Sequence, residues 1–126
     1  MIIDHIRDLE EFKNLYENRP MPSQYDFNWL INNPHLYCFY NEDKPYNLLG
    51  FITIQKENGV LTLSGTSIRK NYDNVITAIK TICSAFDEDI YAFTPLKEAS
   101  LVLKRVGFKK VYSNDSKVKK WRLTNG

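Results

Sequence analysis

The stretch LTLSGTSIRKNYDNVITAIKTI, residues 61–82, places an apolar strand, a basic turn and a helix in direct succession. Many proteins hold a phosphate in such a segment, because the N–H groups and the dipole at a helix start attract anions. The cations Arg69 and Lys70 fit this use. No glycine occurs from Thr66 to Ile82, however, and glycine is the residue that lets a backbone approach a phosphate closely. The stretch therefore predicts a strand, a cationic turn and a helix, and leaves phosphate binding open.

The residues from the start of the chain to Leu63 predict two helices and four strands. Asp8 is expected to cap a helix that runs to Asn18, and Ser23 to cap a second helix that includes Phe27–Ile31 and stops before Pro34. Asn58-Gly59 is a strong hairpin signal between two strands. The expected strands in this part are Ile2–His5, His35–Tyr40, Asn47–Gln55 and Val60–Leu63. The last three are predicted to form an antiparallel meander.

The residues after it predict alternating helices and strands. Apolar side chains recur at helical spacing from Tyr72 to Phe86, and a second helix is expected from the cap Thr94 to Val106, with Gly107 as its stop. The expected strands are Asp89–Phe93, Phe108–Tyr112 and Val118–Leu123. A β-α-β-α-β order predicts a partly parallel sheet with helices on its faces. The predicted fold is thus α/β (α+β), with a mixed sheet of six to seven strands and about four helices.

Length and composition favour one globular domain over residues 1–126. The chain is 43% hydrophobic, which is enough for a core, and its net charge of +2 gives no strong argument for nucleic acid binding. Cys38 and Cys83 lie in apolar segments without metal-ligand spacing, so we interpret them as reduced core thiols of a cytoplasmic protein. No apolar run reaches the roughly 20 residues that span a bilayer, and no signal peptide is predicted at the start.

The element order, together with the segment LVLKRVGFKKV (Leu101–Val111) and Arg69 before the long helix, resembles the GNAT N-acetyltransferases. In that family the loop before this helix grips the pyrophosphate of acetyl-CoA with backbone N–H groups. The resemblance implies six candidate cofactor-binding residues in this chain: Arg69, Lys70, Asn71, Tyr72, Asp73 and Asn74. The two glycine positions of the family fall on Tyr72 and Asn74, so close approach of the backbone to a phosphate is disfavoured there. A solvated helix start is the simpler explanation of these residues, and we favour it over a phosphate-binding loop.

Two further positions depart from the pattern of the family. The tyrosine that protonates the leaving thiolate in the family corresponds to Leu103, which has no proton to give. The asparagine found after the fifth strand is replaced by Thr94-Pro95, and Thr94 suits a helix cap. The remaining acid–base candidates, His5, His35 and a few carboxylates, form no Ser-His-Asp or metal constellation. We therefore assign no catalytic residue and no metal ligand from the sequence.

The same segments also resemble the GNAT-like internal virion proteins of short-tailed phages, which share the altered loop and a leucine at the tyrosine position. That resemblance implies a protein partner, such as a virion component, and a location in the host cytoplasm or the virion. The first hypothesis is thus a GNAT-fold protein with a degraded acetyl-CoA site, acting as an accessory or virion-associated binding protein that uses no cofactor.

Two other hypotheses stay open at this stage. The second is a divergent N-acetyltransferase that uses acetyl-CoA and binds its pyrophosphate through Arg69, Lys70 and the N–H groups of Asn71–Asn74, with the amine held between the fourth and fifth strands. The third, and weakest, is a nucleic-acid-binding module that uses the basic C-terminal third, including Lys109, Lys117 and Lys120.

Overall fold

The computed structural model describes residues 1–18, 26–42, 47–67, 72–115 and 117–125. The helices are α1 (Leu9–Glu17), α2 (Phe27–Ile31), α3 (Tyr72–Cys83) and α4 (Lys97–Val106). The strands are β1 (Ile2–Asp4), β2 (Leu36–Tyr40), β3 (Leu48–Glu57), β4 (Val60–Ser67), β5 (Ile90–Thr94), β6 (Lys109–Val111) and β7 (Lys119–Leu123).

The seven strands form one mixed sheet in the order β1-β2-β3-β4-β5-β7-β6. The predicted meander of β2, β3 and β4 is confirmed, and the Asn58-Gly59 turn between β3 and β4 has both residues at positive φ (52° and 82°), as the Asn-Gly signal requires. β4 and β5 pair in parallel, because α3 carries the chain back across the sheet. The remaining neighbours pair antiparallel. The predicted mixed sheet with four helices is therefore confirmed.

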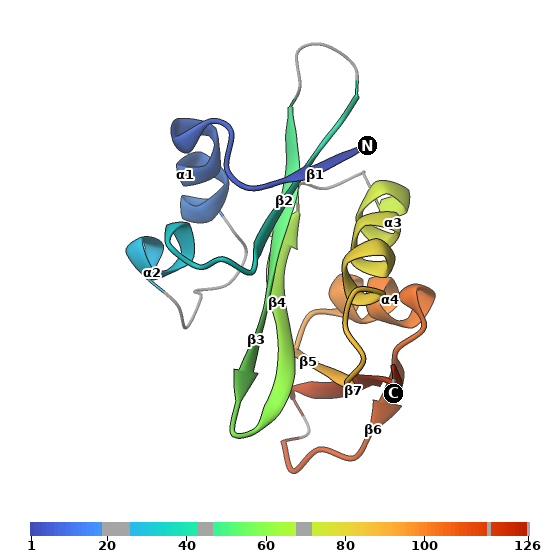
Figure 1. Ribbon diagram of the computed structural model, residues 1–126. Helices are drawn as coiled ribbons and strands as arrows, with labels where there is room; N and C mark the ends of the chain where they lie inside the picture. Colours follow the sequence, from blue (N-terminus) through green and yellow to red (C-terminus); the bar gives the residue numbers. More distant parts are fainter. Residues whose placement is uncertain (19–25, 43–46, 68–71, 116, 126) are drawn as a thin grey trace.

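The helices divide between the two faces of the sheet, with α1 and α2 on one face and α3 and α4 on the other (Figure 1). The larger core cluster lies under α3 and α4 and joins residues such as Ile79 and Leu103 to Ile54, Ile90 and Trp121. The smaller cluster lies under α1 and α2, around Phe12 and Leu30, and reaches β2 and β3 but contains no residue of β5, β6 or β7. Helices α1 and α2 thus cover only part of their face of the sheet.

The structure corrects several predicted boundaries. β4 extends to Ser67, well beyond the predicted end at Leu63, because β3 is long enough to pair with all of it. α3 ends at Cys83 instead of Phe86. α2 begins at Phe27 with Asp26 as its N-cap, whose carboxylate accepts from the N–H of Trp29 at 2.7 Å. The expected cap Ser23 lies outside the described residues.

The caps of the other helices are partly as predicted. Asp8 caps α1 and accepts hydrogen bonds from the N–H groups of Glu10 and Glu11 at 3.0 and 3.2 Å. Gly107, at φ 122°, ends α4 as predicted. The expected N-cap role of Thr94 is wrong in detail: α4 begins at Lys97, and the Thr94 hydroxyl accepts from the N–H of Leu96 at 3.0 Å in the turn before the helix. Cys38 and Cys83 are buried and free of any disulfide.

No helix of the described residues is long and apolar enough to cross a membrane.

Candidate functional site

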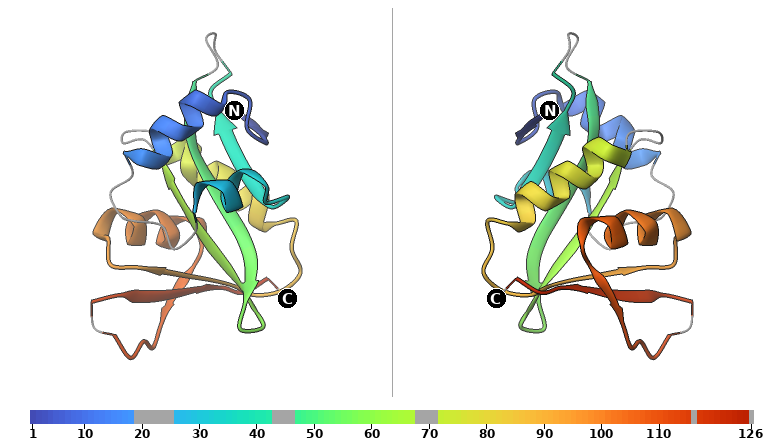
Figure 2. Two further views of the ribbon diagram at one scale, coloured as in Figure 1. Left: turned by 90° about the vertical axis from the view of Figure 1, so that its left-hand side faces the viewer. Right: turned by 90° about the vertical axis from the view of Figure 1, so that its right-hand side faces the viewer.

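The central feature of the sheet is a fork between β4 and β5. The two strands pair only from Leu61 with Ile90 to Leu63 with Ala92. Beyond that point β4 continues through Ser67 while bonded to β3 on one side, and β5 continues to Thr94 while bonded to β7. Figure 2 shows β5 and β7 crossing the direction of β3 and β4 at a steep angle. The two central strands therefore separate from Ser64 and Phe93 onward.

A fork in the middle of a sheet leaves backbone groups of two strands without a neighbouring strand. No described residue pairs with Ser64–Ser67 on the β5 side, or with Phe93 and Thr94 on the β4 side. Strand edges of this kind bind extended ligands that carry their own amide groups, since those amides replace the missing strand. The fork is thus a candidate site for an extended, amide-containing molecule.

Gly65 fixes the shape of β4 where the fork opens. A Cβ at this position would lie 2.2 Å from the carbonyl oxygen of Phe51 and 2.8 Å from Cα of Ile52, both in the backbone of β3. Only glycine therefore allows the two strands to approach so closely here. Next to it, Ser64 lies opposite Thr53, whose hydroxyl is buried and has no hydrogen-bond partner in the described part of the chain.

The six predicted cofactor-binding residues divide into two groups. Arg69, Lys70 and Asn71 lie outside the described residues. Tyr72, Asp73 and Asn74 form the exposed first turn of α3, the helix that follows β4. The Tyr72 side chain is 38% exposed, so it is not buried in the sheet. The helix start thus faces solvent, where its N–H groups can meet a ligand anion.

Asp73 brings a carboxylate to this helix start. Its Oδ1 lies 3.3 Å from Nη2 of Arg105 in α4, and both side chains are exposed. An acidic residue in the first turn stabilises the helix through its dipole, but its charge opposes the binding of another anion at the same place. Arg105, in contrast, adds a cation within reach of the first turn of α3.

The position of the missing tyrosine is part of the core. Leu103 lies in α4, is 5% exposed and packs in the larger core cluster. It supplies no proton, as the sequence predicts. The preceding turn of α4 contains the hydroxyl of Ser100, which accepts a hydrogen bond from Nε1 of Trp121 at 3.3 Å. Trp121 is opposite Ala92, the last residue of β5 that pairs with β4, so Ser100 is tied to the fork.

The two histidines have structural surroundings. His5 Nε2 lies 3.3 Å from the carbonyl oxygen of Asn33, and His35 Nδ1 lies 3.3 Å from the hydroxyl of Tyr37. Neither histidine is in or beside the fork strands. The residues that the structure describes contain no group of three His, Cys, Asp or Glu side chains that could hold a metal ion.

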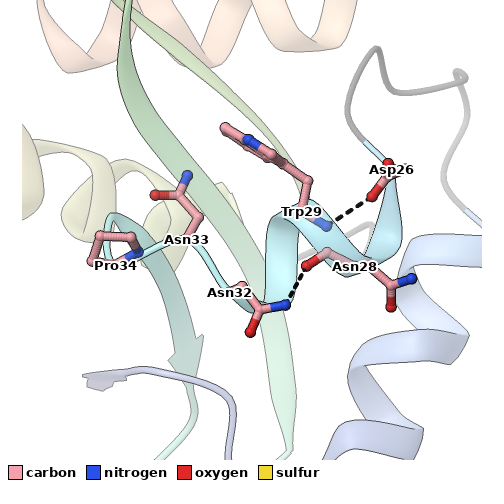
Figure 3. Close-up of a pocket in the computed structure, with 6 residues that line it drawn as sticks. All are labelled: Asp26, Asn28, Trp29, Asn32, Asn33 and Pro34. Carbon is pink, nitrogen blue, oxygen red and sulfur yellow. Dashed lines mark hydrogen bonds between the residues drawn. The ribbon is translucent and has the colours of Figure 1, made fainter.

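A pocket lies against α2 and is lined by Asp26, Asn28, Trp29, Asn32, Asn33 and Pro34 (Figure 3). Its polar groups serve the ends of a short helix: Asp26 accepts from the N–H of Trp29, and the side-chain amide of Asn32 donates to the carbonyl oxygen of Asn28. The Asp26 carboxylate and the Asn32 amide thus form hydrogen bonds to the backbone of α2 itself. We therefore favour the fork over this pocket as the functional site.

Burial raises the pKa values of groups that would otherwise be nucleophiles. Loss of solvent raises the pKa of both Cys38 and Cys83 to about 12, and the pKa of Tyr40 also to about 12. A thiol with such a pKa stays protonated at neutral pH and is a poor nucleophile. The cysteines are thus core residues, in agreement with their interpretation from the sequence.

One set of side chains beside the fork was not predicted from the sequence. Tyr91 and Phe93 project from β5, and the ammonium of Lys120 in β7 lies 5.1 and 5.7 Å from the centroids of their rings. The sequence does contain a signal for them: side chains alternate between the two faces of a strand, so Tyr91 and Phe93 of the predicted strand lie on one face. Their pairing with β7 required the structure.

Comparisons with known proteins agree with this arrangement. A spermidine N-acetyltransferase SpeG variant from Vibrio cholerae superimposes with a TM-score of 0.69 and 16% identity, over 98% of this chain and 94% of the other. NAA60 of Arabidopsis thaliana, solved with a bisubstrate analogue, gives 0.63 and 13%, over 97% and 96%. A GNAT-family acetyltransferase from Bacillus anthracis gives 0.59 and 12%, over 97% and 96%.

No protein-family model and no curated protein matches the sequence. At these identities the likeness concerns the fold, and it extends over nearly the whole of each chain. The single mixed sheet with two helices on each face thus has the GNAT acyl-CoA N-acyltransferase fold.

Proposed function

We propose that the chain is a divergent N-acetyltransferase that binds acetyl-CoA in the fork between β4 and β5. The observation that carries this proposal is the end of strand pairing at Leu63 and Ala92, with β4 continuing for four further residues. The pantetheine arm of acetyl-CoA is extended and contains two amides, so it fits two strand edges that lack a partner. The structural similarity to known acetyltransferases supports the same function.

The pyrophosphate of acetyl-CoA needs hydrogen-bond donors and positive charge, and two parts of the chain offer them. The exposed first turn of α3 offers backbone N–H groups to the pyrophosphate, and Arg105 provides a cation 3.3 Å from Asp73 in that turn. Arg69 and Lys70, which precede the helix, add positive charge in the sequence. Positive side chains here compensate for the absence of glycine at Tyr72 and Asn74.

The chemistry is a direct transfer between two substrates. Acetyl-CoA supplies an activated thioester; the nitrogen of a neutral amine attacks its carbonyl carbon, the C–N bond forms, the C–S bond breaks, and the proton lost by nitrogen ends on the thiolate. The chain contributes orientation in the fork, which is a large source of rate enhancement. Since Leu103 has no proton to donate, we propose that water protonates the thiolate.

Calorimetric titration of the purified protein with acetyl-CoA and with CoA tests the proposal. We expect micromolar binding, weakened about 1–3 kcal/mol by Arg69→Ala, the usual scale of a charge-assisted hydrogen bond. Lys13→Ala, which removes an exposed cation from α1, is the matched control and should leave the affinity unchanged. Absence of binding at millimolar ligand would refute the proposal.

A second candidate function is favoured by the loss of the acid at Leu103 and by the carboxylate of Asp73 at the helix start. In this alternative the acetyl-CoA site is degraded, and the fold serves as an accessory, virion-associated binding protein of the phage type that the sequence resembles. It predicts no acetyl transfer and stable association with a virion component. Co-purification with phage particles, together with no CoA binding, would support this alternative over the first.

A further inference from the structure

The described residues leave the face of the sheet that carries α1 and α2 partly open beside the fork. The core cluster under these helices reaches β2 and β3 and contains no residue of β5, β6 or β7. Figure 2 shows β5 and β7 extending past α1 and α2 on this side. Strand alternation and register place Tyr91 and Phe93 of β5 on this face, next to Arg122 and Lys120 of β7. Phe93 is half exposed and lies just beyond the last β4–β5 pair.

The charges on this part of the face are mainly positive. Arg122 is neutralised by Asp89, with Nη2 and Oδ2 3.0 Å apart. Lys120 forms no ion pair with the described residues, and its ammonium instead lies near the faces of two aromatic rings. Lys109 of β6 lies opposite Arg122 and is exposed. The acid Glu57 shares this face but lies at the closed end of the fork, where it accepts a hydrogen bond from Gln55.

We propose that this open face binds the amine acceptor through a carboxylate or phosphate group on the acceptor, with Lys120 as the counter-ion. This inference rests on the proposed function. Lys120 with its two rings, and Lys109 nearby, complement an anion that is joined to a short apolar segment. The anion would be held beside the open end of the fork, so the amine can reach the thioester. A polyamine such as spermidine carries only positive charge and is disfavoured at the same face.

Matched pairs of amines provide the test, since each pair differs by one anionic group. Phosphoethanolamine is compared with ethanolamine, glutamate with glutamine, and spermidine serves as the cationic probe. Release of CoA from acetyl-CoA gives kcat/KM for each. We expect the anionic member of at least one pair to be favoured about tenfold, equal to 1.4 kcal/mol, and spermidine to be the poorest acceptor. Equal values within both pairs, or a preference for spermidine, would overturn the proposal.

Variants at Lys120 connect the preference to this face. Lys120→Ala should raise KM for the anionic acceptor about tenfold with little change in kcat, because the contact is the same in ground and transition states. Lys120→Glu should reverse the preference in any pair for which the wild type favours the anionic member. Lys104→Ala, on the exposed side of α4, is the matched control with the same loss of charge. An unchanged preference in Lys120→Glu contradicts the inference.

Binding measured by NMR separates this inference from the proposed function. Phosphoethanolamine, but not ethanolamine, should shift the ring resonances of Tyr91 and Phe93. If these shifts occur while acetyl-CoA does not bind, the anion site stands and the transferase function fails. If acetyl-CoA binds and neither phosphoethanolamine nor glutamate shifts the rings, the transferase function stands and the anion site fails.

Discussion

Trp121 of β7 donates a hydrogen bond from its indole Nε1 to the hydroxyl of Ser100 in α4, over 3.3 Å. The indole is buried and lies opposite Ala92, where β4 and β5 cease to pair. This hydrogen bond therefore links α4 to β7 beside the apex of the fork. Because the indole has one N–H donor, and the described residues offer it no other acceptor, the Ser100 hydroxyl satisfies a group that would otherwise be buried without a partner.

Removing this acceptor should destabilise the protein. We expect Ser100→Ala to lower the free energy of unfolding by about 1–2 kcal/mol, because it leaves the Trp121 N–H buried and unsatisfied. Urea unfolding followed by circular dichroism measures the change. Ser100→Thr retains the hydroxyl and is the control, expected nearer to the wild type. Equal midpoints for the alanine variant and the wild type would show that water replaces the serine.

Gly65 should tolerate no side chain. In Gly65→Ala the new Cβ would meet the backbone of Phe51 and Ile52 at 2.2 and 2.8 Å, and neither backbone atom can move without displacing β3. We expect a loss of about 3 kcal/mol in stability, the upper part of the range for overpacking, together with weaker acetyl-CoA binding. Ser64→Ala, one residue earlier, should have a small effect. A fully stable Gly65→Ala protein would disprove the close approach of the two strands.

Asp73 should oppose anion binding at the start of α3. We expect Asp73→Asn to tighten CoA binding by up to about 1 kcal/mol, because a negative charge leaves the first turn and Arg105 loses its carboxylate partner. Calorimetry compares the variant with Asp115→Asn, whose exposed carboxylate lies in the turn before β7. Weaker CoA binding in Asp73→Asn would show that the carboxylate helps to form the site.

Stability should fall as the pH rises above 9. The pKa of Cys83 is raised from 9.0 to about 12 in the folded protein by burial, so the folded state keeps its thiol proton while the unfolded state releases it. The contribution of this group is complete below pH 9 and is lost progressively toward pH 12, with a slope of at most about 1.4 kcal/mol per pH unit. Cys38 behaves alike, since burial also raises its pKa to about 12.

Urea unfolding at pH 8, 9 and 10 measures this slope. Cys83→Ala should reduce the slope between pH 9 and 10 relative to the wild type, whatever its effect on stability at pH 8. Ser84→Ala, in the next position and exposed, serves as the control. Parallel slopes for Cys83→Ala and the wild type would mean that the thiol is not protected by burial.

Local signals accounted for most of the elements. The Asp8 cap, the Asn58-Gly59 turn and the Gly107 stop act through their own backbone and neighbouring residues, so the sequence predicts them directly. The end of β4 was predicted wrongly because Ser64–Ser67 has no apolar pattern, and its strand conformation comes from pairing with β3. α4 begins later in the sequence than predicted, because the Thr94 hydroxyl accepts a hydrogen bond within the turn that precedes the helix.

The candidate site was only partly accessible to sequence reasoning. Leu103 and the three residues Tyr72–Asn74 could be located by the family resemblance. The structure places Leu103 on α4 in the larger core cluster, and Tyr72–Asn74 at the start of α3. Lys120 could not be linked to Tyr91 and Phe93, because the pairing of β7 with β5 joins segments about thirty residues apart, and such register depends on the whole sheet.

The sequence by itself determined the order of helices and strands, the buried thiols and the absence of an acid at Leu103, since these follow from local propensity, burial and residue type. Only the tertiary structure decided where β4 and β5 separate and which charged and aromatic side chains border that fork. The physical reason is that strand pairing is non-local: the last pair, Leu63 with Ala92, depends on β3 and β7 holding their partners in diverging directions.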